Sequence, residues 1–348
     1  MNDAMQFICT KISNWIKNPA VHYFQLEIPD LTTDADGLKL NDGYFQVFVS
    51  ECFLKYKKEW FNDLFPAAHT AIRYSVANRP NVDLSHVSRS SSEDLSAAII
   101  HNTKVTNLVP WRGGTLEIDC SLISLRGKNE LKSAFQLLGS FSELVAAPVA
   151  QALNIAGKVA TGVQDLMISN NGDVHLNYSN SFTSAQGKNP FHPGYFLSIL
   201  ATQADLKGYK FSVEKDHLLA NGKDFAAFDY LLFRIDYYRQ NPEWNSFVEI
   251  ERAMTSAMNA YADGTPEGLQ KGDEHRIAAR IAANNSDDLS PLDKIRVVKS
   301  IDGYLEQYRQ AAYGGAAPAV ADMNLDQLMK SEYALKWEDA IALSASNS

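Results

Sequence analysis

The chain has 348 residues, of which 45% are hydrophobic and 21% are charged. This balance is typical of a globular protein and excludes disorder over most of the length. The formal net charge of -9 at pH 7 disfavours nucleic acid as a partner, because binding to a phosphate backbone depends on clustered lysine and arginine.

The first twenty residues predict a short amphipathic helix and no secretion signal. They contain no basic start and no apolar stretch followed by a small-residue cleavage site. Their apolar residues recur at three- and four-residue spacing. The three cysteines, Cys9, Cys52 and Cys120, form no CxxC pair and are too few for a disulfide framework. We therefore expect a cytoplasmic protein with free thiols.

Four runs rich in aromatic and β-branched residues predict strands in the first part of the chain. They cover residues 21–28, 43–56, 69–76 and 114–125. In the last run apolar residues alternate with Glu117, Asp119 and Ser121, which predicts one buried face and one polar face. Residues 77–96 contain Pro80 and a serine-rich stretch, so we expect a polar surface loop there.

Residues 133–157 are the most apolar segment of the chain, because Glu143 is their only charged residue. Helical spacing predicts a helical region over 129–167, and Pro148 kinks this region or divides it into two helices. Polar residues and the proline interrupt it as a membrane span. A hairpin buried in the core is therefore favoured. The alternative is conditional insertion of residues 133–167 into a membrane, since small residues there would allow close helix contact.

The second half of the chain begins with further strand patterns. Strands are expected at residues 192–203 and 229–239. Between them, Asn221-Gly222 predicts a tight hairpin turn, because both positions tolerate a positive φ.

The C-terminal part predicts helices. One starts near Asn241-Pro242, and another starts at Ser290-Pro291. The second helix is expected to bury a stripe made of Leu292, Ile295, Val298, Ile301, Leu305 and Tyr308. Residues 311–322 indicate a linker, and residues 325–343 predict a last amphipathic helix that docks back or binds a partner.

Together these elements predict an α+β protein in two parts. Residues 1–240 are expected to form mainly antiparallel sheets packed on the Pro-interrupted apolar helical region of residues 129–167. Residues 241–348 are expected to form a helical C-terminal portion. Strands do not alternate regularly with helices, which disfavours a doubly wound parallel sheet. No internal repeat of solenoid or propeller length is present.

The sequence contains no catalytic signature. It lacks a phosphate-binding GxxxxGK[ST] loop and a GxSxG nucleophile motif. No two of the eight histidines lie within five residues of each other, so no metal site is predicted. Arg234 and Asp236 share one strand face, where an ion pair is expected. Glu117 and Asp119 also share a face, as a general acid and base or a divalent ion would require, although a solvated strand face is favoured.

Five strings of the chain resemble an uncharacterised bacterial protein family. They are residues 43–69, 109–125, 150–167, 192–196 and 228–239, and the resemblance covers roughly residues 40–310. The resemblance implies an association with bacterial conflict or phage-defence loci. It implies no activity, catalytic residue or ligand, and no site residue is carried over.

These observations favour a cytoplasmic interaction or accessory protein without catalysis, in a bacterial defence system. Its expected partner is another protein, and no cofactor is expected. One alternative is a latent membrane-active effector that exposes residues 133–167 after activation. The other is a hydrolase that uses Glu117 and Asp119.

Overall fold

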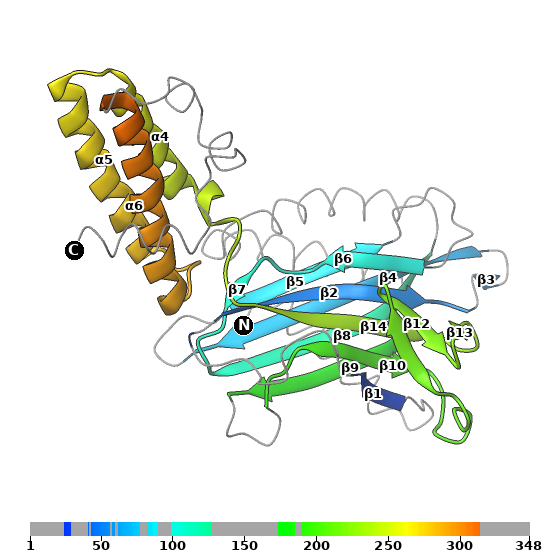
Figure 1. The fold of residues 1–348 in the computed structure, drawn as a ribbon. Helices are drawn as coiled ribbons and strands as arrows, with labels where there is room; N and C mark the ends of the chain where they lie inside the picture. Colours follow the sequence, from blue (N-terminus) through cyan, green and yellow to red (C-terminus); the bar gives the residue numbers. More distant parts are fainter. Residues whose placement is uncertain are drawn as a thin grey trace. The chain divides into compact units, whose positions relative to one another are not determined.

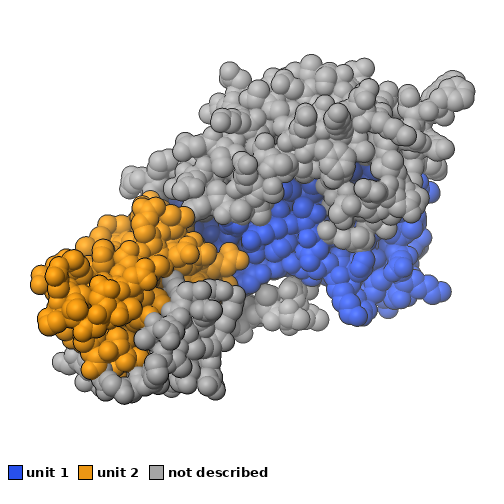
Figure 2. Space-filling view, turned by 90° about the horizontal axis from the view of Figure 1, so that it is seen from above, with its two compact units in different colours: residues 1–40, 44–238 blue, residues 41–43, 239–348 orange. Residues whose placement is uncertain are grey.

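The structure is a computed structural model, whose fold is drawn in Figure 1. It describes residues 24–28, 41, 43–55, 58–59, 62–76, 82–89, 99–126, 173–184 and 190–313. The chain divides into two compact units, coloured separately in Figure 2. The strand unit comprises residues 1–40 and 44–238, and the helical unit comprises residues 41–43 and 239–348. Antiparallel sheets and helices together confirm the predicted α+β class.

The first sheet of the strand unit has the order β1-β10-β14-β2-β6, and β7 also pairs with β2. Its strands are β1 (Phe24–Ile28), β2 (Tyr44–Phe53), β6 (Ile99–Lys104), β7 (Val109–Pro110), β10 (Gly194–Ile199) and β14 (Tyr230–Tyr238). All pairings are antiparallel. Four of these strands confirm the strands expected at 21–28, 43–56, 192–203 and 229–239.

The second sheet has the order β3-β4-β8-β9, and β5 also pairs with β4. Its strands are β3 (Lys58–Glu59), β4 (Asn62–Ser75), β5 (Val82–Arg89), β8 (Thr115–Arg126) and β9 (Asp173–Thr183). The β8–β9 ladder runs from Thr115↔Thr183 to Ser124↔Asp173, so the two strands pair almost up to the end of β8.

Strand β5 lies within the stretch expected to be a polar loop, and that prediction is wrong for residues 82–89. The strand pairs with β4 from Tyr74↔Val82 to Ala67↔Arg89. Its alternate residues Leu84, His86 and Ser88 are buried. The buried residues recur along this strand with a period of two, but two of them are polar, so the alternation cannot be recognised from hydrophobicity alone.

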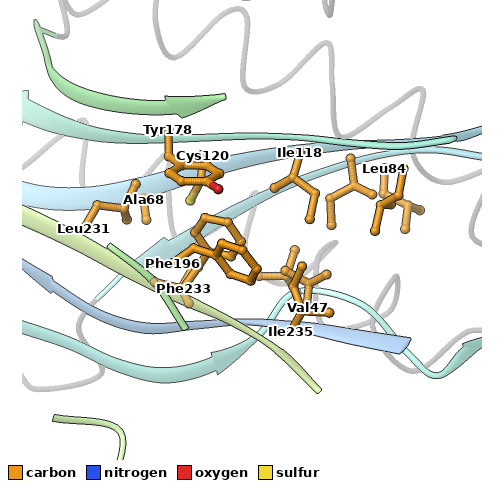
Figure 3. Packing of buried hydrophobic residues seen from close by; sticks show 14 of the residues in the cluster. Val47, Ala68, Leu84, Ile118, Cys120, Tyr178, Phe196, Leu231, Phe233 and Ile235 are labelled. Atoms are coloured by element: carbon orange, nitrogen blue, oxygen red, sulfur yellow. The ribbon is translucent and has the colours of Figure 1, made fainter. Parts of the chain in front are cut away.

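The two large sheets pack face to face around one hydrophobic core (Figure 1). Phe196 and Phe233 of the first sheet stack with ring centroids 5.0 Å apart, and Tyr178 of the second sheet meets Phe233 edge-on at 4.7 Å. Figure 3 shows these rings pointing toward one another between the layers. Cys120 lies in the same core, where burial raises the pKa of its thiol to about 12. This thiol is therefore protonated and unreactive.

The alternation expected in β8 is confirmed on its inner face and only partly on its outer face. Leu116, Ile118, Cys120 and Leu122 are completely buried against the first sheet. On the other face Glu117 is exposed, but Ser121 is buried, as is its cross-strand neighbour His69. The outer face is thus exposed near the start of β8 and buried toward its end.

A small third sheet covers part of the first sheet on the side away from this core. It consists of β11 (Phe211–Glu214), β12 (His217–Ala220) and β13 (Lys223–Asp224). The predicted hairpin turn between β12 and β13 is confirmed, because Asn221 and Gly222 have φ values of 54° and 75°. The buried carboxylate of Glu51 on β2 accepts a 2.7 Å hydrogen bond from the backbone N–H of Leu218, which fixes β12 on the first sheet.

The helical unit contains a 3-10 turn, η1 (Trp244–Ser246), and three α-helices, α4 (Val248–Ala262), α5 (Pro266–Asn285) and α6 (Pro291–Tyr313). The predicted start at Ser290-Pro291 is confirmed, and Ser290 Oγ accepts a 3.2 Å hydrogen bond from the backbone N–H of Asp293. Helix α5 packs closely on α4, because a Cβ on Gly272 would lie 2.2 Å from the ring of Tyr261.

The predicted helix start at Asn241-Pro242 is wrong, since α4 begins at Val248. The backbone N–H of Asn241 donates to Asp293 Oδ2 at 2.9 Å, and its side-chain Oδ1 accepts from the backbone N–H of Glu243 at 2.9 Å. This pattern holds the segment in a turn against α6.

The predicted buried stripe of α6 is confirmed at Ile301, Leu305 and Tyr308 and is wrong at Leu292 and Ile295, which are exposed. On a helix, the side chains of residues three apart differ in direction by about 60° around the axis. Leu292 and Ile301 are separated by three such steps, which add up to half a turn, so the two residues lie on opposite sides of α6.

Several predicted elements lie outside the described residues. They are the N-terminal helix, the apolar helical region of residues 129–167 and the amphipathic helix of residues 325–343. Helix α6 continues to Tyr313, so residues 311–313 do not belong to the predicted linker, and residues 314–322 lie outside the described residues.

Candidate functional site

Glu117 and Asp119 lie on the outer face of β8, as predicted, and both are close to a cation. Arg73 pairs across β4 and β8 with Glu117, and its Nη1 lies 3.9 Å from Glu117 Oε2. Burial raises the pKa of the Asp119 carboxyl, while a hydrogen bond from Ser179 and the charge of Arg73 oppose this rise. Glu117 is exposed, as the favoured interpretation of a solvated strand face expects, whereas Asp119 is partly buried. A hydrolase role for them receives no support from this arrangement.

Three residues from different strands and loops reproduce the atom order of a serine-hydrolase triad. Ser124 Oγ lies 2.9 Å from His175 Nε2, and His175 Nδ1 lies 3.8 Å from Asp229 Oδ2. Ser124, however, is completely buried and offers a substrate no access. Asp229 also accepts a 2.7 Å hydrogen bond from the backbone N–H of Lys55. The group therefore ties β8, β9 and the start of β14 together as a buried polar connection.

This group cannot be predicted from the sequence, because its three residues are far apart along the chain and form no motif. Ser124 and His175 are 51 residues apart and become neighbours only through the β8–β9 register. A triad is recognised by geometry and not by sequence position.

Arg234 and Asp236 form the expected ion pair, with Arg234 Nε 2.7 Å from Asp236 Oδ1. The guanidinium also pairs with Asp216, at the turn between β11 and β12, and lies over the ring of Phe48 at 4.5 Å from its centroid. Tyr195 donates a 3.0 Å hydrogen bond to the same Asp216 carboxylate. The cation is thus balanced by two carboxylates, and the cluster fastens the third sheet to the first.

The candidate functional site is an exposed aliphatic surface on helices α5 and α6. We call it the α5–α6 surface and define it by Ile277, Ile281, Leu292 and Ile295, whose exposed fractions are 54%, 54%, 40% and 57%. Single exposed aliphatic residues are ordinary on protein surfaces, but two pairs at helical spacing on adjacent helices are not scattered. Such a surface is typical of a protein-binding site.

Two side-chain contacts fix how α5 and α6 lie against each other. Lys294 Nζ donates to the carbonyl oxygen of Asn284 at 2.7 Å, and Arg276 Nε donates to Asp302 Oδ1 at 2.8 Å. The helices are therefore antiparallel, and Ile281 and Ile295 lie at neighbouring levels along the pair.

The aliphatic residues point away from the core of the helical unit. On α5, Ile277 and Ile281 lie about half a turn around the helix from the buried Ala279 and Ala283. On α6, Ile295 lies two turns before Asp302 and on the same side, because seven residues make nearly two full turns.

Basic side chains flank the aliphatic ones. Lys299 lies one turn after Ile295, and within the described part of the chain its ammonium has no ion-pair partner. Arg280, beside Ile281, is half-exposed and lies 3.7 Å from Asp302. Helices α5 and α6 therefore carry exposed aliphatic residues with basic residues beside them along each helix, on a chain whose overall charge is negative.

Within the described ranges, no three His, Cys, Asp or Glu residues are grouped so as to hold a metal ion. None of the described helices combines the length and apolar character needed to cross a bilayer.

Comparison with known proteins finds no family model, no curated protein and no solved structure that matches this chain.

Proposed function

We propose that this chain is a cytoplasmic interaction protein without catalysis, which binds another protein through the α5–α6 surface and serves as an accessory component of a bacterial defence system. The observation that carries the proposal is the paired exposure of Ile277 with Ile281 and of Leu292 with Ile295. Burying an aliphatic side chain against a partner contributes roughly 1.5–3 kcal/mol, so a few such residues supply most of a specific affinity.

The proposed partner presents an apolar face with an acidic edge. Lys299 and Arg280 would meet that edge, since opposite charges at the border of an interface favour encounter and orientation. The partner is therefore a protein surface and not a phosphate backbone, which would require many more clustered cations.

A photo-crosslinking experiment tests this proposal. The photoreactive residue p-benzoylphenylalanine replaces Ile281 or Ile295 in the full chain, expressed in its own cells. We expect one discrete adduct from both positions and none from Glu267, an exposed control position on the same helix. The cross-linked protein is then purified, and its affinity for the unlabelled chain is measured. The double variant I277K/I295K should weaken this affinity by at least about tenfold, while thermal stability stays within about 0.5 kcal/mol.

The proposal fails if Ile281 and Ile295 give no adduct, or if Glu267 gives the same adduct. It also fails if I277K/I295K binds the cross-linked protein as tightly as the unchanged chain does.

A second candidate function is a latent membrane-active effector, in which residues 133–167 enter a bilayer after activation. It is supported by the position of this segment between two directly paired strands. β8 and β9 pair up to Ser124↔Asp173, and residues 127–172 join them outside the described residues. The ladder of hydrogen bonds between β8 and β9 is complete without that segment, so its release would leave the sheet paired.

Liposome flotation with dye release tests the second candidate. The full chain and a form cleaved at a protease site introduced between 314 and 322 are mixed with phosphatidylglycerol and phosphatidylethanolamine vesicles. We expect binding and leakage only after cleavage, and loss of both in the variant A146K/A150K, because a charged residue at the bilayer centre costs about 3 kcal/mol. If neither form binds vesicles, this candidate is excluded.

A further inference from the structure

An open apolar groove in the strand unit lies next to β1, the edge strand of the first sheet. Its volume is about 650 Å³, within the range of small-molecule sites. Its lining is formed by Phe24, Leu26, Gln203, Ala204, Leu206, Lys207, Tyr209 and Phe211. Most of these residues are apolar, and none is acidic. All of its lining residues belong to the strand unit.

The wall of the groove is a turn that hydrogen bonds hold in place. Asp205 Oδ2 accepts hydrogen bonds from the backbone N–H of Thr202 at 3.0 Å and from its hydroxyl at 2.7 Å. Further along, the Asn221 side chain donates to the carbonyl oxygen of Gly208 and accepts from the backbone N–H of Lys210. The wall is therefore formed before a ligand arrives, which lowers the entropy lost on binding.

Aromatic and aliphatic side chains form the apolar part of the groove. Tyr209 and Phe211 stack with their ring centroids 6.0 Å apart, and Tyr209 remains 37% exposed. Leu206 is buried in the same lining, and Phe24 and Leu26 contribute from β1. An elongated hydrocarbon chain would cover these groups and remove them from water.

One cation marks the polar part of the groove. Within the described residues, the Lys207 ammonium forms no ion pair, although Gln203 lies in the same lining. The nearby carboxylate of Asp205 is already bound by Thr202. An anionic head group at Lys207 would thus meet an unpaired positive charge and an amide donor.

We propose that this groove binds a free long-chain carboxylate, with its hydrocarbon chain along Phe24, Leu26 and Tyr209 and its carboxylate at Lys207. A neutral hydrocarbon would leave the ammonium unpaired, and a cationic amphiphile would be repelled by it. The inference does not depend on the proposed protein interaction, because the residues concerned belong to different units.

Isothermal titration of the full chain with dodecanoate, below its micelle concentration, tests this inference. We expect saturable binding of one molecule per chain. K207Q should weaken it by about tenfold, since one charge-assisted hydrogen bond is lost, while K207R should retain most of it. K210Q is the matched control, because Lys210 lies three residues further along the same turn and outside the lining, and its affinity should not change. Y209A should also weaken binding, through the apolar part of the groove.

Dodecyltrimethylammonium, which has the same chain and the opposite charge, is the control ligand. The inference is overturned if this cation binds as tightly as dodecanoate, if K207Q and Y209A both leave the dodecanoate affinity unchanged, or if dodecanoate does not bind. Each of these results leaves the α5–α6 surface and its cross-linking test unaffected.

Discussion

Replacing Phe233 with alanine is expected to lower the free energy of unfolding of the strand unit by about 3–5 kcal/mol. The ring is completely buried at the centre of the core, where it stacks on Phe196 and receives the edge of Tyr178 from the opposite sheet. Its removal leaves a cavity that the two sheets can close only in part, because each is held by its own ladder of hydrogen bonds. Two aromatic contacts are lost as well.

The measurement is hydrogen exchange of peptides from β14 and α5 over a series of urea concentrations. Because the chain has two units, a single unfolding curve would mix them. Exchange in β14 should become faster in F233A, while exchange in α5 stays the same. K210Q is the control, since replacing an exposed lysine should cost less than about 0.5 kcal/mol. An F233A effect as small as that of K210Q would show that Phe233 is no anchor of the core.

Strands with a clear period of two could be predicted from the sequence, and strands with mixed composition could not. The inner face of β8 follows directly from the alternation of Leu116, Ile118 and Cys120. The same alternation in β5 involves Leu84, His86 and Ser88, and burial of the last two depends on β4 and the core beside them. A polar residue becomes part of a core only when its neighbours supply hydrogen bonds, which a single strand does not reveal.

In the helical unit, the sequence likewise does not fully predict which side of α5 and of α6 is buried. Helix α5 buries small residues, Gly268, Gly272, Ala279 and Ala283, and therefore presents no apolar stripe. The small residues let α5 approach α4 closely, so that the helix is buried without large apolar side chains of its own. This approach depends on the position of the Tyr261 ring. In α6 the apolar residues could be recognised, but the side that faces the core is set by packing against two other helices. The exposure of Leu292 and Ile295, on which the candidate site depends, therefore required the structure.

For the candidate catalytic residues, too, the sequence predicts one feature and the structure is needed for another. Glu117 and Asp119 share a face as any residues two apart on a strand must. The pairing of Glu117 with Arg73 follows from the β4–β8 register, which the sequence does not contain. The spacing of residues along one strand thus predicts which of them share a face. Only the pairing register with the neighbouring strand shows which residues lie opposite them.

Lowering the pH from about 6.5 to about 4 is expected to destabilise the strand unit by about 3 kcal/mol for each of two buried histidines, His69 and His86. Burial lowers the pKa of both imidazoles from 6.5 to about 4, and the positive charge of His69 further lowers that of His86. Both rings are almost inaccessible to water. His69 faces Ser121 and Val87 across the sheet, and His86 faces Thr70 and lies 3.1 Å from Ser88 Oγ.

The direction of this effect follows from the protons bound in each state. In the unfolded chain both imidazoles take up a proton near pH 6.5, whereas in the folded chain they stay neutral until about pH 4. The unfolded state therefore binds more protons between these values, and the free energy of unfolding decreases as the pH falls. The stabilisation is fully present above pH 6.5, is lost progressively as the pH falls from there towards the folded pKa of about 4, and decreases no further below it.

Urea unfolding of β4 and β8, followed by hydrogen exchange at several pH values, measures this loss. H69Q should reduce the pH dependence by about half, because one of the two buried imidazoles is then absent. The comparison uses the change in the free energy of unfolding with pH and not its absolute value. A variant that is less stable at every pH therefore remains informative. An independent check is the NMR titration of the imidazole protons in the folded chain. Resonances of His69 and His86 should not move between pH 7 and about pH 5, and a midpoint near 6.5 for either ring would contradict its burial as a neutral group.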